Sequence, residues 1–197
     1  MKIWLTLLMV GLLVWQCRPE AEVILGPGVK AAAEPVQQLM QQAQPFDLKG
    51  YMVTPLATFS LEAKVLAKKR YRIGRESDLS PYDLALGWGQ MSDEAVLEHI
   101  EISQSGRWYR WRTQNFPIPR RAIERQSANM HLVPADNAVL QTLKQIQPGQ
   151  VIALQGKLIR VDAADGWHWK SSLTREDTGH GACELVYVTG LNIVAGH

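Results

Sequence analysis

Apolar and polar residues alternate along several stretches of this chain, and the alternation predicts strands. In residues 59–65 every second residue is apolar. A period of two residues is typical of a strand that buries one face. The apolar positions are Phe59, Leu61, Ala63 and Val65.

Similar patterns predict further strands in residues 99–113, 150–162, 167–173 and 184–194. Ser105-Gly106 and Asp165-Gly166 interrupt these patterns and are typical of hairpin turns. Gly156 lies inside one predicted strand, where a glycine indicates a bulge or a sharp bend.

Capping residues predict several short helices. Ser80-Pro81 resembles a helix start, and Gly87 and Gly89 resemble its end. Asp136 is placed to cap a helix over residues 137–146, whose apolar residues share one face. Further short helices are predicted at residues 33–43, after Ser92 and within residues 119–125.

Together these elements predict an α+β fold dominated by strands. A capping helix, a long bent strand, a hairpin and a final strand follow one another in the C-terminal part. This order favours a small closed or partly open β-barrel of the OB or SH3 kind.

The N-terminus carries the clearest targeting signal. Residues 3–15 contain no charge and no proline, Lys2 precedes them and Arg18 follows. A lone transmembrane helix needs about 20 apolar residues, so this segment is short for one. It is consistent with a cleaved signal peptide, an uncleaved signal-anchor, or a lipoprotein signal ending at Cys17. Trp15 and Gln16 stand where a lipoprotein signal has small residues.

We therefore predict a signal or membrane-anchor segment at residues 1–17 and a location in the cell membrane or periplasm. Residues 18–45 are rich in proline, glycine, alanine and glutamine and are predicted to be a linker. Residues 46–197 are predicted to form a single β-rich domain. The net charge of +2 is too small to require nucleic acid or an acidic membrane as a partner.

The most reactive side chains occur near the C-terminus, where His180 precedes Cys183 by three residues. Gly179 and Gly181 disfavour a helix, and in an extended chain residues three apart lie about 10 Å apart and point in opposite directions. The pattern favours a buried thiol at the start of a strand. His131, His180 and Cys183 are therefore only weak catalytic candidates.

Neither a metal site nor a cofactor site is predicted. The histidines do not occur in HxH or HxxxH spacings, and the chain has no CxxC pair. With two cysteines, the chain also lacks a disulfide framework.

A basic and aromatic stretch is the best candidate for an interaction surface. Arginine side chains suit phosphates and other anions, and flat rings stack on bases or sugars. Alternatively, the arginines pair with nearby acidic residues on an ordinary two-faced strand. The candidates are Arg107, Trp108, Tyr109, Arg110, Trp111 and Arg112, with Arg120, Arg121 and Arg125 following.

Four stretches resemble a family of conserved, uncharacterised bacterial proteins, many of which have an N-terminal hydrophobic segment. The resemblance covers roughly residues 45–190 and implies an envelope-directed bacterial protein, with no known activity. The stretches are SDLSPYDLALGWGQMSD, ISQSGRWYRW, SANMHLVPAD and WHWKSSLTREDTGHGACELVYV.

Three functions remain open. The first is a membrane-tethered or exported protein whose β-rich domain binds a protein, a glycan or an anionic headgroup. The second is an envelope enzyme, a cysteine- or histidine-dependent hydrolase or transferase, that uses His131, His180 and Cys183. The third is a nucleic-acid-binding barrel, which requires that the N-terminus does not direct export, because nucleic acid is an uncommon partner outside the cell.

Overall fold

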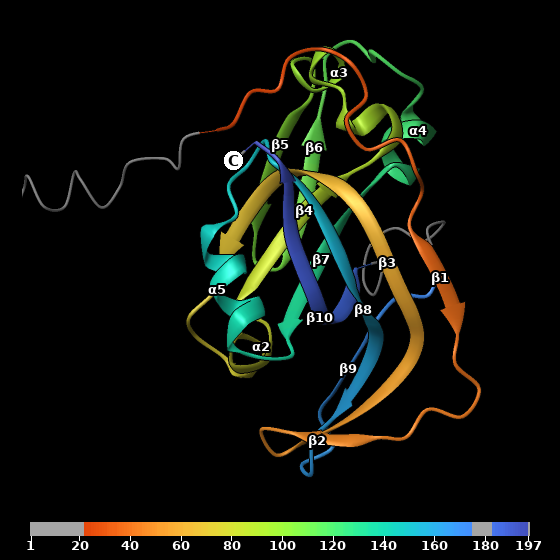
Figure 1. Ribbon diagram of the computed structural model, residues 1–197, viewed down its shortest axis with the longest axis vertical. Helices are drawn as coiled ribbons and strands as arrows, with labels where there is room; N and C mark the ends of the chain where they lie inside the picture. The colour runs from red at the N-terminus through yellow and green to blue at the C-terminus, as the bar shows by residue number, and fades with distance from the viewer. Residues whose placement is uncertain (1–21, 175–182, 197) are drawn as a thin grey trace, which may run out of the picture.

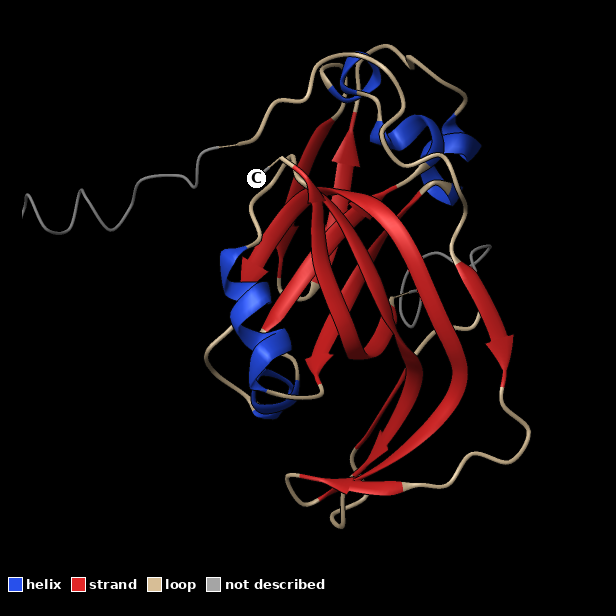
Figure 2. Cartoon of the chain, viewed as in Figure 1, coloured by secondary structure: helices blue, strands red, loops and turns tan. Residues whose placement is uncertain are grey.

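A computed structural model describes residues 22–174 and 183–196. It is an α+β structure dominated by a large mixed sheet, with short helices at its periphery (Figures 1 and 2). This confirms the predicted class. The predicted anchor at residues 1–17 and the candidate His180 lie outside the described residues.

Eight strands form the large sheet and two form a separate hairpin. The large sheet contains β1 (Val36–Leu39), β2 (Phe46–Leu48), β3 (Tyr51–Arg70), β4 (Tyr82–Gly87), β7 (Ser127–Pro134), β8 (Val151–Asp162), β9 (His168–Lys170) and β10 (Glu184–Ala195). The hairpin consists of β5 (Glu101–Ser105) and β6 (Trp108–Arg112). The helices are α2 (Arg75–Leu79), α3 (Glu94–Leu97), α4 (Arg120–Arg125), α5 (Asn137–Gln145) and the 3-10 helix η1 (Gly89–Ser92).

The long strand β3 organises the sheet. The strand order is β1-β3-β4-β7-β10-β8-β9, with β2 also paired to β3. Residues 52–64 of β3 pair with β8, and residues 64–70 pair with β4. Figure 1 shows the strong bend that lets one strand reach both neighbours. Strands β7 and β10 are parallel, and the other pairs are antiparallel.

The main hydrophobic core lies between one face of the sheet and α5. The alternation predicted in residues 59–65 is confirmed, because Phe59, Leu61, Ala63 and Val65 are all buried in this core. The predicted cap of α5 is also confirmed, since the Val139 N–H donates to Asp136 Oδ1 at 2.9 Å. Leu143 then buries the apolar face of α5 against the sheet.

A bulge occurs beside Gly156, but not in the strand for which it was predicted. Gly156 pairs with Val188 of β10, and Gln155 pairs with Gly190, so Thr189 is an extra residue in β10. The bulge is therefore in the partner strand, directly opposite Gly156.

Two predicted helices are wrong. Residues 82–87 form β4, all of whose residues are buried, and the Ser80 hydroxyl donates to the Tyr82 carbonyl instead of capping a helix. Residues 36–39 form β1, which pairs with β3. In both cases pairing with a neighbouring strand outweighs the local capping or helix-forming residues.

An N-terminal strap, residues 22–31, crosses the end of the molecule next to η1 and α3 (Figure 1). The Leu25 N–H donates to Glu94 Oε1 at 2.6 Å, and the Lys64 ammonium donates to the same oxygen at 2.8 Å. Burial alone would raise the pKa of Glu94, but these hydrogen bonds lower it. The strap is thus bonded to the sheet through α3, and the domain boundary at residue 46 stays a prediction.

Among residues 22–174 and 183–196, no helix has the length and apolar character needed to cross a bilayer.

Candidate ligand-binding cavity

The β5–β6 hairpin packs beside the large sheet and forms one wall of a cavity. The Tyr109 hydroxyl donates to Ser127 Oγ at 3.1 Å, and Gln104 Nε2 donates to Asn129 Oδ1 at 2.6 Å. Both contacts join the hairpin to β7. Burial raises the pKa of Tyr109 to about 12, so this phenol stays neutral and keeps its proton for the hydrogen bond.

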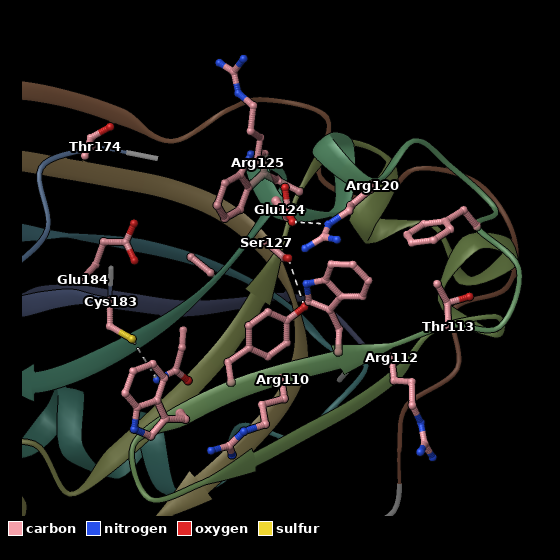
Figure 3. A pocket seen from close by; sticks show the side chains of 17 residues that line it. Arg110, Arg112, Thr113, Arg120, Glu124, Arg125, Ser127, Thr174, Cys183 and Glu184 are labelled. Atoms are coloured by element: carbon pink, nitrogen blue, oxygen red, sulfur yellow. Dashed lines mark hydrogen bonds and ion pairs between the residues drawn. The ribbon is translucent and has the colours of Figure 1, made fainter. Parts of the chain in front are cut away.

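The cavity has a volume of about 670 Å³ and lies between β6, α4 and the beginnings of β7 and β10 (Figure 3). This volume is within the range of about 300–1,000 Å³ that is usual for small-molecule sites. Its aromatic lining comprises Trp88, Trp108, Tyr109, Trp111 and Phe116.

Four of the described residues that line the cavity are arginines, namely Arg110, Arg112, Arg120 and Arg125. Arg120 lies 5.9 Å from the centre of the Trp111 ring and donates to Glu124 Oε1 at 2.8 Å. Figure 3 shows Arg120 turned toward Glu124, whereas the side chains of Arg110, Arg112 and Arg125 extend outward from the centre of the cavity.

The two faces of β6 separate as the alternation predicts. Trp111 is half-buried and packs edge-on against Phe116, with 6.1 Å between ring centres. Arg110 and Arg112 are exposed, and Arg112 pairs with Glu101 at 2.6 Å. The alternative of local ion pairing therefore holds for Arg112, although its side chain also contributes to the cavity lining.

The opposite end of the cavity is formed by Asn129, Thr174, Cys183 and Glu184. Figure 3 shows Cys183 and Glu184 at the far side from Arg112 and Thr113. Asn129 Nδ2 donates to Cys183 Sγ at 3.9 Å, and Glu184 is 6% exposed.

The prediction of a shielded Cys183 thiol is wrong, because Cys183 is only half-buried and lines the cavity. It precedes the first residue of β10, and its carbonyl accepts a hydrogen bond from the Ser172 N–H at 3.1 Å. Strand β10 itself lies between β7 and β8 and has two apolar faces. Leu185 and Tyr187 pack in one core, and Val186 and Val188 pack in the other.

A buried charged group, which we name the Asp83 cluster, lies under the tip of the hairpin and consists of Asp83, Arg107 and His131. Arg107 Nη1 donates to Asp83 Oδ1 at 2.6 Å, and His131 Nδ1 lies 3.0 Å from the same oxygen. Asp83 is fully buried. Arg107 adopts a φ of 68° in the hairpin turn, and its guanidinium stacks 3.9 Å from the Tyr71 ring centre.

Contacts to Tyr71 and Trp169 complete the surroundings of the Asp83 cluster. The Arg107 N–H donates to the Tyr71 hydroxyl at 2.9 Å, and burial is the main cause of the raised pKa of Tyr71. The rings of His131 and Trp169 are 4.9 Å apart. The cluster is thereby fixed on several sides and holds the hairpin tip against β4 and β7.

His131 and Cys183, the two weak catalytic candidates that the structure describes, do not come together in one site. His131 contacts Asp83 and Trp169 and does not line the cavity, whereas Cys183 does. Of the basic and aromatic stretch, Arg107 belongs to the Asp83 cluster and residues 108–112 line the cavity. Among the described residues, no group of three His, Cys, Asp or Glu side chains is arranged to hold a metal ion.

No protein-family model, curated protein or solved structure matches this chain. The sequence pattern does not identify three further lining residues, namely Trp88, Asn129 and Glu184. They lie far along the chain from the basic and aromatic stretch, and the tertiary arrangement brings them to it.

Proposed function

We propose that this is a membrane-tethered or exported bacterial protein whose β-rich domain binds a ligand with an anionic group. The observation that carries the proposal is the cavity of about 670 Å³, lined by arginines and aromatic rings. Arginine forks match the geometry of phosphates and carboxylates, and ring faces accept a flat or apolar body.

The architecture we propose is a small closed or partly open barrel of the OB or SH3 kind. Support comes from the strand pairings, because β3–β4, β4–β7, β7–β10, β10–β8 and β8–β3 form a ring. The cavity then lies at the beginnings of β7 and β10, beside the hairpin that is attached to β4 and β7.

Phenyl phosphate, which combines a flat ring with an anion, is expected to bind in the cavity. Arg120→Gln should weaken binding about 10- to 100-fold, because a charge-assisted hydrogen bond contributes about 1.5–3 kcal/mol. Isothermal titration calorimetry measures the effect. The matched control is Arg121→Gln, which changes the neighbouring arginine of α4 that does not line the cavity.

Protection of the Cys183 thiol gives a second readout in a Cys17→Ser background. Alkylation of Cys183, which lines the cavity, should slow when phenyl phosphate is bound. Equal affinities of the Arg120 and Arg121 variants, together with unchanged alkylation, would contradict the proposed site.

The location is tested by fractionation after expression in a bacterium. We expect the full chain in the membrane or periplasmic fraction, because residues 3–15 are uncharged and apolar. A soluble cytoplasmic product of unprocessed mass would contradict the location and would favour the nucleic-acid-binding alternative.

The enzyme alternative requires a base that acts on the Cys183 thiol. A nucleophile and its base must lie within hydrogen-bond reach. The separate contacts of His131 with Asp83 and of Cys183 with Asn129 support ligand binding over catalysis by this pair. Fast alkylation of Cys183 in the unliganded protein at neutral pH would instead favour the enzyme.

A further inference from the structure

The end of β3 and the turn that follows it form the most basic segment of the chain. Residues 68–75 contain five basic residues and no acidic residue. When residues 76–78 are included, two acidic residues join the five basic ones, and the net charge is +3. The basic residues are Lys68, Lys69, Arg70, Arg72 and Arg75.

Three of these cations are exposed and form no ion pair with any residue that the structure describes, namely Lys69, Arg70 and Arg72. The Arg70 guanidinium lies 5.8 Å from the centre of the Tyr82 ring, a contact that leaves its charge without a carboxylate. Ile73 follows these cations in the turn and is 92% exposed. We name Lys69, Arg70, Arg72 and Ile73 the β3-end surface.

The other two basic residues of the segment have partners within the protein. Arg75 donates to the two carboxylate oxygens of Asp165, at 3.1 and 2.7 Å. Lys68 donates to the Ile146 carbonyl at 2.6 Å. These contacts hold both ends of the segment on the domain, and the exposed charges lie between them.

The N-terminal strap begins close to this surface. The Val23 N–H donates to the Pro148 carbonyl at 2.9 Å, so the strap and Lys68 bond to the same turn between α5 and β8. Figure 1 shows the end of β3 and α5 on the left of the molecule, the side on which the strap also begins. Residue 22 and the β3-end surface are therefore on one side of the domain.

The start of the strap limits how far the domain can lie from the membrane in the tethered protein. Residues 16–22 separate the apolar segment of residues 3–15 from Val23. Seven residues span at most about 25 Å, even when they are fully extended. The strap is bonded to the domain at Val23 and Leu25, so a membrane that holds the apolar segment lies near the β3-end surface.

The composition of the β3-end surface matches a bilayer interface. A single exposed aliphatic residue is ordinary on a protein surface. Beside a group of unpaired cations, however, an aliphatic side chain such as Ile73 is typical of a surface that lies in the headgroup region. Anionic headgroups attract basic residues close to the membrane, and this attraction falls off within about one Debye length, roughly 8 Å.

We infer that the β3-end surface docks on anionic lipid headgroups, an inference that rests on the membrane tether of the proposed function and not on the cavity. Lys69, Arg70 and Arg72 bind headgroup phosphates, and Ile73 enters the interface. The tether and this surface then hold the domain at two points, which fixes its orientation on the membrane. A nucleic acid offers the same anionic phosphates, and the position beside the tether favours the membrane.

The experiment uses the full chain with vesicles of phosphatidylcholine alone and vesicles of phosphatidylcholine mixed with phosphatidylglycerol. Amide hydrogen exchange is measured on both. We expect residues 69–74 to exchange several-fold more slowly on the anionic vesicles. Strand β1 is the internal control, because Val36 and Leu39 are also exposed aliphatic residues but have no such group of cations, and its exchange should not change.

A double variant tests the charges directly. Each basic residue near an anionic bilayer strengthens association by about fivefold, so Lys69→Gln with Arg72→Gln should remove most of the slowing. The matched control is Lys157→Gln with Lys170→Gln, which changes the net charge equally on β8 and β9. Equal slowing in the two double variants would show that net charge, and not the β3-end surface, causes the effect.

Flotation of the full chain with the same vesicles separates this inference from the proposed tether. Flotation with neutral vesicles, together with equal exchange on both vesicle types, would overturn the docking surface and leave the tether standing. Flotation with anionic vesicles alone, with slowing at residues 69–74, would support the docking surface and contradict the tether. Flotation with neither would overturn both.

A DNA duplex, added to the protein on neutral vesicles at the same salt concentration, tests the other anionic partner. We expect exchange of residues 69–74 to remain unchanged. Slowing by the duplex without slowing on anionic vesicles would overturn the membrane assignment and identify a nucleic-acid-binding surface.

Discussion

Replacing Asp83 with asparagine is expected to lower the free energy of unfolding by about 3–5 kcal/mol, the usual cost of breaking a buried ion pair. Asp83 is fully buried and accepts from Arg107 at 2.6 Å. The substitution leaves the Arg107 guanidinium, whose side chain is 18% exposed, without its counter-charge. Denaturation in urea, followed by tryptophan fluorescence, measures the change.

A surface pair of the same chemistry provides the control. Arg160 donates to Asp162 at 2.6 Å, but both side chains are partly exposed to solvent. Asp162→Asn should therefore cost much less than Asp83→Asn, because an exposed ion pair is screened by water. Similar losses for the Asp83 and Asp162 variants would show that burial of the Asp83 cluster contributes little to stability.

A double variant separates the cost of an unpaired charge from the loss of packing. When Arg107→Met is combined with Asp83→Asn, no buried guanidinium is left unpaired, and part of the lost stability should return. Recovery would identify the unpaired charge as the main cost. A double variant as unstable as the sum of the two single variants would instead mean that the two residues act independently.

The strands of the C-terminal half could be predicted because their local pattern and their tertiary environment agree. In β8 and β10 apolar residues face two cores, and turn residues mark the hairpin at Asp165-Gly166. In β4 the local sequence pattern and the tertiary environment disagree. Ser80-Pro81 resembles a helix start, but the strand lies between β3 and β7, and the pairing of Leu84 and Leu86 with these strands decides its conformation.

Only the part of the candidate site that lies within one continuous stretch of sequence could be predicted. The alternation within residues 108–112 assigns Tyr109 and Trp111 to one face, as the structure has them. The Asp83 cluster depends on the register that places Asp83 opposite His131 and on the hairpin turn that brings Arg107 to both. Register between distant strands and the path of a turn are tertiary properties, and one sequence does not specify them locally.

Gly156→Ala is expected to destabilise the sheet strongly. A Cβ at this position would lie 2.2 Å from the Tyr187 carbonyl oxygen and 3.2 Å from Val188 Cα. Both atoms belong to the backbone of β10, so no side-chain rotation relieves the contact. Strands β8 and β10 would have to separate next to the bulge between Val188 and Gly190.

We expect a loss of about 3 kcal/mol or more, at or above the upper end for overpacking, because here backbone must move. The control is Gly190→Ala across the same bulge, where the nearest atom to a new Cβ is Gln155 Cβ at an ordinary 3.6 Å. It should change stability by about 0.5 kcal/mol or less, as is usual for a substitution without a clash. Urea denaturation compares the variants, and amide hydrogen exchange should show faster opening of β8 and β10 in Gly156→Ala alone. Equal stability of the two variants would mean that β10 moves away at little cost and that the close approach at Gly156 does not fix the pairing of these strands.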